Sequence, residues 1–387
     1  MGVISIGDLV TDFYYKNGKL VGVNGGMTSH NIIANIAKLG LETSVYGVCG
    51  DDMAGTIAVS SLKEVGTNVD NVKKLKSINT RCFHVSYQEL NGKLEFVSKK
   101  RCPICNIKRW YDESKIEVND ILKQINRDDV LIFDNLNKKN QIIIDICNNR
   151  KMLDLGQYFE LEDYNDNDIV EKIKDKFDLI NLNERVEKYL KNRFSIKSLE
   201  DIYNILHPKM IIVTRGKNGS DFVFDNNRVN KKLNDPEVEV DPTGAGDAFF
   251  SMFISEYIKN NYLIDYKFID STFEKATKLT KKVVKKFGAR GHIQNLYKIK
   301  KAKDFCTCSN FDISLRKQIK RCNININNLE TRIINAINSS AYDKLAKINF
   351  ESFNNSIFVG TGGSFAGAKF SSKLINHLYG VNTITLY

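Results

Sequence analysis

The segment Asp241–Phe249, with the sequence DPTGAGDAF, restricts the fold more than any other stretch of this chain. The small residues Gly244, Ala245 and Gly246 precede Asp247 and a long apolar run that has the pattern of a helix. Amide groups at the start of a helix point outward, and together with the helix dipole they form a binding site for phosphate. The carboxylate of Asp247 can take a proton from a hydroxyl held at the same place.

Phosphoryl transfer needs both of these elements, because the moving group carries negative charge and the attacking hydroxyl must be oriented. We therefore expect the backbone of Gly244, Ala245 and Gly246 to form an anion hole and Asp247 to act as the base. A glycine-rich helix cap followed by an acidic first turn is the alternative interpretation.

The rest of the chain predicts an α/β fold. The run VISIGDLV near the N-terminus reads as a buried strand, and from Asp129 onward short apolar runs alternate with helix-like stretches. Such alternation favours a mostly parallel sheet that is covered by helices and binds ligands at the carboxyl ends of its strands. Asn17-Gly18 and Asn91-Gly92 each stand between strand-like residues, which predicts two hairpins in a small separate β-sheet, a lid.

Composition and charge exclude several classes of protein. The 387 residues are 42% hydrophobic and 27% charged, as in a folded globular protein. The net charge of +11 arises between Lys275 and Lys303, so a uniformly basic nucleic-acid coat is excluded. Most of this charge is expected on the solvent side of a helix with an apolar stripe from Ala276 to Phe287, while Arg290 is expected to meet nucleotide phosphate. With no signal-peptide pattern and no apolar run of membrane-spanning length, we expect a cytoplasmic protein without a membrane partner.

The DPTGAGDAF segment resembles the C-terminal signature of the ribokinase-like (PfkB-type) carbohydrate kinases. Further segments resemble other motifs of that family in the expected order, over about residues 1–298. They are Gly7-Asp8 with Asp12, Gly25-Gly26 with Asn31, Gly50-Asp51-Asp52-x-x-Gly55, Val213–Gly219, and Gly288-Ala289.

This resemblance implies a three-layer α/β fold with a β-sheet lid, and a phosphotransferase that moves the γ-phosphoryl group of ATP, used with Mg²⁺, to an alcohol group. The substrate would be a sugar or sugar derivative, with a nucleoside as the alternative. Substrate hydroxyls would be held by Asp12, Gly25, Gly26 and Asn31, although Asn31 also suits a helix cap. The nucleotide would be bound by Asn183, Thr214, Gly216, Gly219 and Gly288. A homodimer formed through the lid is a further expectation.

Two cation sites are left open by the sequence. The family has an Asn-x-x-Glu pair near Mg²⁺, but the segment Asn181–Glu187 gives conflicting alignments, so no magnesium-organising pair is assigned. Asp241 and Thr243 resemble the family's monovalent-cation position, with Pro242 as a substitution within it, and K⁺ activation is therefore a hypothesis.

The C-terminal part has its own pattern. Residues 299–328 read as a basic, polar linker, and Ser356–Val359 as a strand that runs into Gly360-Thr361-Gly362-Gly363-Ser364. This strand and loop resemble the opening of a sugar isomerase (SIS) domain, so residues 329–387 are expected to be a partial phosphosugar-binding domain of a truncated chain. A loop that only caps a helix is the alternative. The kinase domain would then span residues 1–298, with its lid at about 10–25 and 80–100.

Four cysteines form two close pairs, Cys102 with Cys105 and Cys306 with Cys308. Together they provide the four thiolates of a structural Zn²⁺ site, but the pairs are far apart in sequence, and unrelated reduced thiols are the favoured interpretation. A non-catalytic sugar-phosphate sensor is the rival function from another class. An intact base and anion hole argue against it.

Overall fold

The computed structural model describes residues 1–16, 18–90, 93–102, 109–111, 113–156, 165–233, 240–298, 355–359 and 382–386. Within them, contacts divide the chain into two units, Met1–Asp312 and Ile313–Tyr387, which are taken separately below. Among these residues, no helix combines the length and the hydropathy that crossing a membrane requires.

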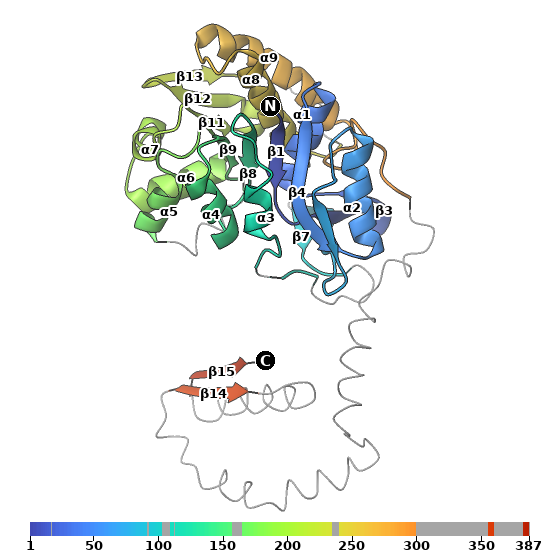
Figure 1. Ribbon diagram of the computed structural model, residues 1–387. Coiled ribbons are helices and arrows are strands. Elements are labelled where there is room, and N and C mark those ends of the chain that lie inside the picture. The colour runs from blue at the N-terminus through green and yellow to red at the C-terminus, as the bar shows by residue number, and fades with distance from the viewer. Residues whose placement is uncertain are drawn as a thin grey trace, which may run out of the picture. The chain divides into compact units, whose positions relative to one another are not determined.

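The first unit is built on a nine-stranded sheet with the order β13-β12-β11-β10-β9-β8-β1-β4-β5 (Figure 1). Neighbouring strands from β11 through to β5 run parallel, whereas β12 and β13 are antiparallel at one edge. The strands are Val3–Ile6 (β1), Thr43–Gly50 (β4), Val72–Leu75 (β5), Val130–Phe133 (β8), Arg150–Asp154 (β9), Leu179–Asn183 (β10), Met210–Thr214 (β11), Ser220–Phe224 (β12) and Asn227–Lys231 (β13). The predicted mostly parallel sheet is confirmed.

Helices cover both faces of this sheet, which gives three layers. Successive residues of a strand point to opposite faces, so each buried strand supplies both cores. On β11, Met210 and Ile212 pack in the cluster that includes α1, α2, α8 and α9, while Ile211 and Val213 pack with α4, α5, α6 and α7. The helices are Thr28–Lys38 (α1), Met53–Glu64 (α2), Val118–Leu122 (α3), Lys138–Ile146 (α4), Asp166–Ile173 (α5), Glu184–Phe194 (α6), Leu199–Leu206 (α7), Ala245–Lys259 (α8) and Tyr266–Val283 (α9).

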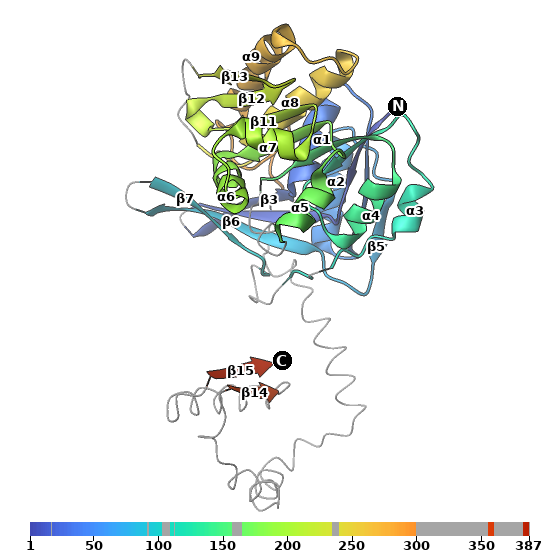
Figure 2. The ribbon, with the colours of Figure 1, turned by 90° about the vertical axis from the view of Figure 1, so that its left-hand side faces the viewer.

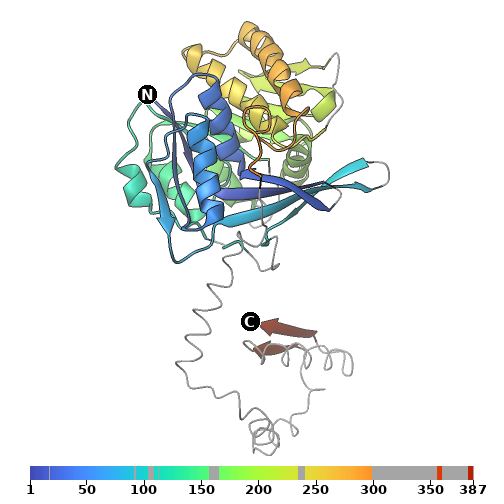
Figure 3. The same ribbon diagram turned by 90° about the vertical axis from the view of Figure 1, so that its right-hand side faces the viewer.

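A second sheet, with the order β3-β2-β6-β7, forms the predicted lid. Its strands are Val10–Lys16 (β2), Lys19–Gly25 (β3), Arg81–Leu90 (β6) and Lys93–Lys99 (β7), and both predicted hairpins are present as the antiparallel pairs β2–β3 and β6–β7. The turn residues Asn17, Asn91 and Gly92 lie outside the described residues. Figures 2 and 3 show these strands extending away from the layered core.

The helix in the basic segment ends before the last residue of its predicted apolar stripe. Ala276 and Val283 are buried on α9, as expected, but the helix ends at Val283, and Phe287 lies beyond it. Gly288 has a positive φ of 86°, a conformation that a continuing helix does not allow, so the chain turns at this point. Lys278, Lys282 and Lys285 are exposed, which confirms a solvated basic surface.

In the second unit, the described residues are two parallel strands, Asn355–Val359 (β14) and Asn382–Leu386 (β15). The strand expected at Ser356–Val359 is therefore present. The expected linker, the helix and the glycine-rich loop of the tail lie outside the described residues.

Candidate active site

The DPTGAGDAF segment joins the loop after Asp241 to helix α8, as its sequence predicts. Gly244 precedes α8 with a φ of +81°, and a Cβ at this position would lie 2.6 Å from the carbonyl oxygen of Ala289. A glycine is therefore required at 244 by both conformation and space. A Cβ on Gly246, in contrast, would have no heavy atom within 4 Å. The first turn of α8 is thus open at Gly246, where a ligand can approach the backbone.

Asp247 lies in the same turn, and its carboxylate is held from a distant part of the chain. Nδ2 of Asn31, on α1, donates to Oδ2 of Asp247 at 2.7 Å. Burial raises the pKa of Asp247 to about 7, and the negative charges of Asp134 and Asp12 add to this, while Asn31 and Arg290 oppose it. A carboxyl group with this pKa takes up and releases a proton near neutral pH, as a general base must.

Further buried carboxylates surround Asp247. Asp134 follows β8, and Asp154 ends β9, so both stand at carboxyl ends of parallel strands. Burial, followed by the charge of Asp247, raises the pKa of Asp154 to about 7. Burial also raises the pKa of Asp134, which accepts a hydrogen bond from the amide of Ser29 at 2.8 Å. No sequence motif predicts Asp134 or Asp154 as functional residues, although each stands at the end of one of the short apolar runs that follow Asp129.

The predicted substrate residues lie together between the sheet and the lid. Asp12 is on lid strand β2, and a Cβ on Gly26 would lie 2.3 Å from its carboxyl oxygens. The loop at Gly25-Gly26, the predicted substrate loop, therefore passes directly over this carboxylate. The hydroxyl of Tyr14 donates to Asp12 at 3.1 Å and accepts from the amide of Ala289 at 3.2 Å. Burial raises the pKa of Asp12 to about 7.

Gly25 is packed against other side chains and does not face open space. A Cβ there would lie 2.3 Å from Oγ of Ser61 and 2.7 Å from Nη1 of Arg290. The expectation that Arg290 reaches nucleotide phosphate is wrong, because its side chain is 1% exposed and bonded to Asn31, Ser61 and the Gly26 carbonyl. Its position next to a glycine-rich nucleotide motif in the sequence gave no indication of these partners.

A cavity of about 280 Å³ opens beside the first turn of α8. It is lined by Thr214, Gly216 and Gly219, three residues predicted to bind the nucleotide, and by Ala245 and Gly246 of the predicted anion hole. Apolar side chains of α8 and α9 form one wall, and two lysines supply positive charge. The remaining lining residues are Lys217, Ser220, Leu233, Pro242, Phe249, Phe273, Thr277, Thr280, Lys281 and Val284.

The side chain of Asn183, another predicted nucleotide residue, has local partners. Its Oδ1 accepts from the amide of Val186, which caps α6, and its Nδ2 donates to the Gly156 carbonyl. Glu187 is ion-paired with Arg215 at 2.7 Å. Asn181 donates to Asp154 at 2.7 Å, whereas its buried Oδ1 has no hydrogen-bond partner. Within the segment 181–187, Asn181 therefore has a buried side-chain oxygen that accepts no hydrogen bond from the protein.

Gly288, the last predicted nucleotide residue, is tied to the start of the DPTGAGDAF segment. Its amide donates to Oδ2 of Asp241 at 2.7 Å, and Oδ1 of the same carboxylate accepts from the amide of Thr243 at 2.8 Å. The loop at 288 and the loop before α8 are thus held as one piece. Potassium activation, expected from the resemblance of Asp241 and Thr243 to a monovalent-cation position, stays a prediction.

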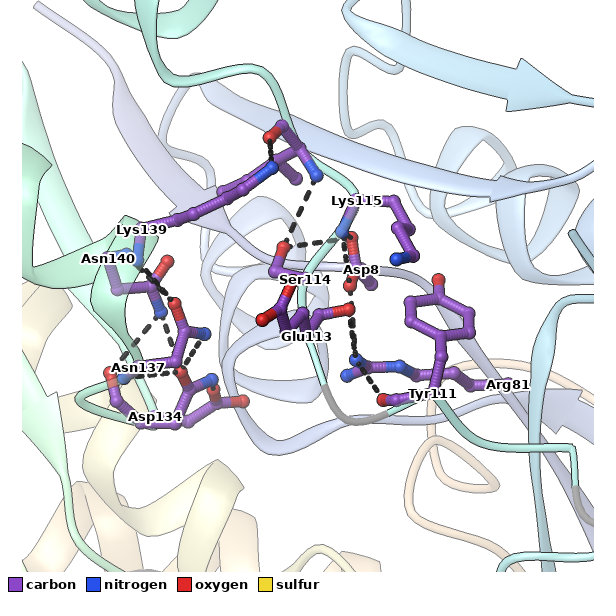
Figure 4. Close-up of polar contacts among 12 residues, drawn as sticks. Asp8, Arg81, Tyr111, Glu113, Ser114, Lys115, Asp134, Asn137, Lys139 and Asn140 are labelled. Carbon is purple, nitrogen blue, oxygen red and sulfur yellow. Dashed lines mark hydrogen bonds and ion pairs between the residues drawn. The ribbon is translucent and has the colours of Figure 1, made fainter. Parts of the chain in front are cut away.

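Two buried ion pairs attach the base of the lid to the core. Figure 4 shows the carboxylate of Asp8, after β1, between Arg81 of the lid and the segment that carries Ser114 and Lys115. The guanidinium of Arg81 also stacks on the ring of Tyr111, with 4.2 Å to the ring centroid. Next to it, Asp52 of the predicted Gly50–Gly55 motif pairs with Arg109, accepts from Thr80, and caps α2 through the amide of Gly55.

The zinc hypothesis stays untested. Cys102 is buried, and Cys105, Cys306 and Cys308 lie outside the described residues. Among the residues that the structure describes, no group of three or more His, Cys, Asp or Glu side chains has an arrangement that could hold a metal ion.

Solved structures that resemble this chain identify its fold. An uncharacterized sugar kinase from Pyrococcus horikoshii is 17% identical with a TM-score of 0.58, over 79% of this chain and 99% of its own. Aminoimidazole riboside kinase from Salmonella enterica is 16% identical with a TM-score of 0.58, over 76% and 97% of the two chains. Adenosine kinase from Sinorhizobium meliloti is 16% identical with a TM-score of 0.59, over 74% and 95%. The fold is therefore the ribokinase-like α/β fold with its small second sheet.

The sequence identifies the family. Residues 3–294 match the model of the pfkB family carbohydrate kinases, and the chain belongs to this family. Comparison with curated proteins gives no match. The family match ends at residue 294, and none of these findings supports the resemblance of the tail to a sugar isomerase domain.

Proposed function

We propose that this protein is an ATP-dependent kinase that transfers the γ-phosphoryl group to a hydroxyl of a sugar or sugar derivative. One observation carries the proposal: the buried carboxylate of Asp247, with a pKa near 7, lies one residue after the open backbone at Gly246 and beside the cavity lined by Thr214, Gly216 and Gly219. A base, an anion hole and space for a nucleotide thus occur at one end of α8. The family membership and the Pyrococcus sugar kinase fold, also solved in complex with ATP, agree with this function.

In the proposed reaction, Asp12 and Asn31 hold substrate hydroxyls under the lid, and ionised Asp247 accepts the proton of the attacking hydroxyl. The backbone amides of residues 244–246 stabilise the phosphoryl group as it moves. A lid over the site excludes water, so that ATP is not hydrolysed without a substrate.

Mg²⁺ enters with ATP and neutralises phosphate charge when bound. The oxygen chemistry of this site fits it, because Asn181 has a buried Oδ1 without a partner and Asp154 lies next to Asn181. These two side chains are proposed to hold water of the magnesium shell. The assignment of Asn183 as a nucleotide ligand is retained as a proposal, carried by its place at the carboxyl end of β10.

A nucleoside kinase of the same fold is the second candidate. Two of the similar structures are an aminoimidazole riboside kinase and an adenosine kinase, so this fold serves ribosides as well as sugars. The acidic interior around Asp12, Asp134, Asp154 and Asp247 favours a polyhydroxylated ligand, since carboxylates accept hydrogen bonds from sugar hydroxyls. A sugar is therefore the first choice.

The test is a panel of neutral sugars, sugar derivatives and nucleosides, each incubated with Mg-ATP while ADP formation is followed. ADP formation that depends on one sugar supports the proposal, and turnover of nucleosides alone selects the second candidate. Sugar-phosphate binding without ATP turnover on any compound contradicts both and favours a non-catalytic sensor.

A further inference from the structure

Arg290 has an unusual environment for a charged side chain. It is 1% exposed, yet it lies in the loop after α9 and reaches three other elements. Nε donates to Oδ1 of Asn31 at 2.9 Å, Nη1 donates to Oγ of Ser61 at 2.8 Å, and Nη2 donates to the carbonyl of Gly26 at 3.2 Å. Burying a charged side chain costs free energy unless hydrogen-bond partners are well placed around it. Here α1, α2 and the substrate loop each supply one such partner.

The contact with Asn31 decides which way the Asn31 amide points. An arginine has donors and no acceptor, so Oδ1 of Asn31 must face Nε of Arg290. Nδ2 of Asn31 then faces Asp247, to which it donates at 2.7 Å. The opposite orientation would set an NH₂ group against the guanidinium and an oxygen against the carboxylate, two repulsive contacts in a buried site.

We infer that Arg290 is the positioning residue of the proposed base, acting through Asn31. The inference rests on the proposed function, in which Asp247 accepts the substrate proton. Arg290 does not touch the reacting atoms. It fixes the donor that orients the Asp247 carboxylate, and its hold on the Gly26 carbonyl ties the same arrangement to the loop that is proposed to bind substrate.

The charges around Asp247 are consistent with this role. Asp12 on β2, Asp134 after β8 and Asp154 on β9 are carboxylates that disfavour ionisation of Asp247, whereas Arg290 favours it. Burial lowers the pKa of Arg290 only to about 10, so it keeps its charge at neutral pH. Arg290 thus opposes the neighbouring carboxylates as well as orienting Asn31.

The inference is tested by NMR of the protein with ¹³C-labelled aspartate carboxyls, in which the Asp247 signal is assigned by its loss in Asp247→Asn. In Arg290→Met, we expect the titration midpoint of Asp247 to rise by about 1 pH unit, the effect of losing a neighbouring opposite charge. His292→Ala is the matched control. His292 is on the same loop and bonds to Asn35 on the same helix at 2.7 Å, without contacting the Asn31 side chain, so its loss should leave the midpoint unchanged.

A double-mutant cycle of Arg290→Met with Asn31→Ala separates positioning from charge alone. If Arg290 acts through Asn31, it lowers kcat about 10²-fold in the wild-type background and much less in the Asn31→Ala background. Additive losses of kcat, or a wild-type midpoint in folded Arg290→Met, would overturn the inference, as would an equal shift in His292→Ala. If Arg290→Met does not fold, Arg290→Gln, which also removes the positive charge, takes its place in both measurements. The titration needs no turnover, so an inactive wild-type protein contradicts the proposed function while the midpoints still show whether Arg290 acts on the Asp247 carboxyl group.

Discussion

Asn31 and Asp247 are 216 residues apart in sequence, and the amide of Asn31 donates to the Asp247 carboxylate at 2.7 Å. The contact joins α1, which begins after the substrate loop, to α8, which begins at the proposed anion hole. The proposed substrate and nucleotide regions therefore share one hydrogen-bonded pair.

Activity should depend on pH through Asp247. The base must be ionised, and its pKa is raised to about 7, so kcat/KM should rise with pH through neutrality and be about tenfold lower at pH 6 than on the plateau. The profile is measured with saturating Mg-ATP and limiting sugar. A kcat/KM that is constant from pH 5.5 to 8 would contradict a base with this pKa.

Stability should fall as pH rises from about 4 to 7. Burial raises the pKa of Asp154 to about 7 in the folded protein, from about 3.8 for a solvent-exposed aspartate. The folded state therefore binds the proton more tightly in this interval, and ionisation destabilises it. Asp154→Asn removes this effect. Its Tm should therefore exceed that of the wild type by more at pH 8 than at pH 5, at about 2–4 °C for each kcal/mol of difference in stability.

The control for this experiment is Asp225→Asn, which changes an exposed aspartate on the turn between β12 and β13. It should give the same small change in Tm at both pH values. A Tm difference for Asp154→Asn that does not vary with pH would rule out a raised pKa at this carboxyl.

Asp52 should be essential for the attachment of the lid. Asp52→Ala removes the cap of α2, the hydrogen bond that Asp52 accepts from Thr80 and the buried ion pair with Arg109, a loss of about 3–5 kcal/mol in the free energy of unfolding. Denaturant unfolding measures this loss. The neighbouring Asp51 is exposed, and Asp51→Ala should change stability by no more than about 0.5 kcal/mol. Equal effects of the two variants would show that the ion pair is not what holds the lid.

Substitutions at Gly244 and Gly246 should have different effects, the first on stability and the second on activity. Gly246→Val places its side chain in open space, so the variant should fold with a wild-type Tm and lose roughly 10²-fold in kcat/KM for ATP, because the side chain blocks the anion hole. Gly244→Ala forces a positive φ and a clash with Ala289, so it should lower the Tm. Unchanged kinetics for Gly246→Val would remove the anion hole from this turn.

Local patterns in the sequence supplied most residues of the proposed site. The DPTGAGDAF segment predicted Asp247 and the glycines as candidates, since the chemistry of that turn depends on residues adjacent in sequence. The alternation of strands and helices predicted the mostly parallel sheet, which the structure confirms. Asp134 and Asp154 also stand at the carboxyl ends of parallel strands, where ligands bind in folds of this kind. No sequence motif distinguishes them from other residues at strand ends.

Arg290 could not be assigned correctly from the sequence. Its three partners lie on Gly26, Asn31 and Ser61, more than 200 residues earlier, and only the packing of α1 and α2 against the loop after α9 brings them together. A cation beside a glycine pair fits a phosphate contact equally well when only local sequence is considered. The partners of Arg290 are set by packing between segments that are distant in sequence, which local sequence patterns do not encode.

The central claim, that Asp247 is the base of a phosphoryl transfer, is tested most directly by Asp247→Asn. The substitution keeps the size of the side chain, so circular dichroism and Tm should show an intact fold. On the substrate that the panel identifies, we predict that kcat for ADP formation falls by about 10²–10⁴-fold, the contribution of a general base. A folded Asp247→Asn protein with near-wild-type kcat would contradict the account.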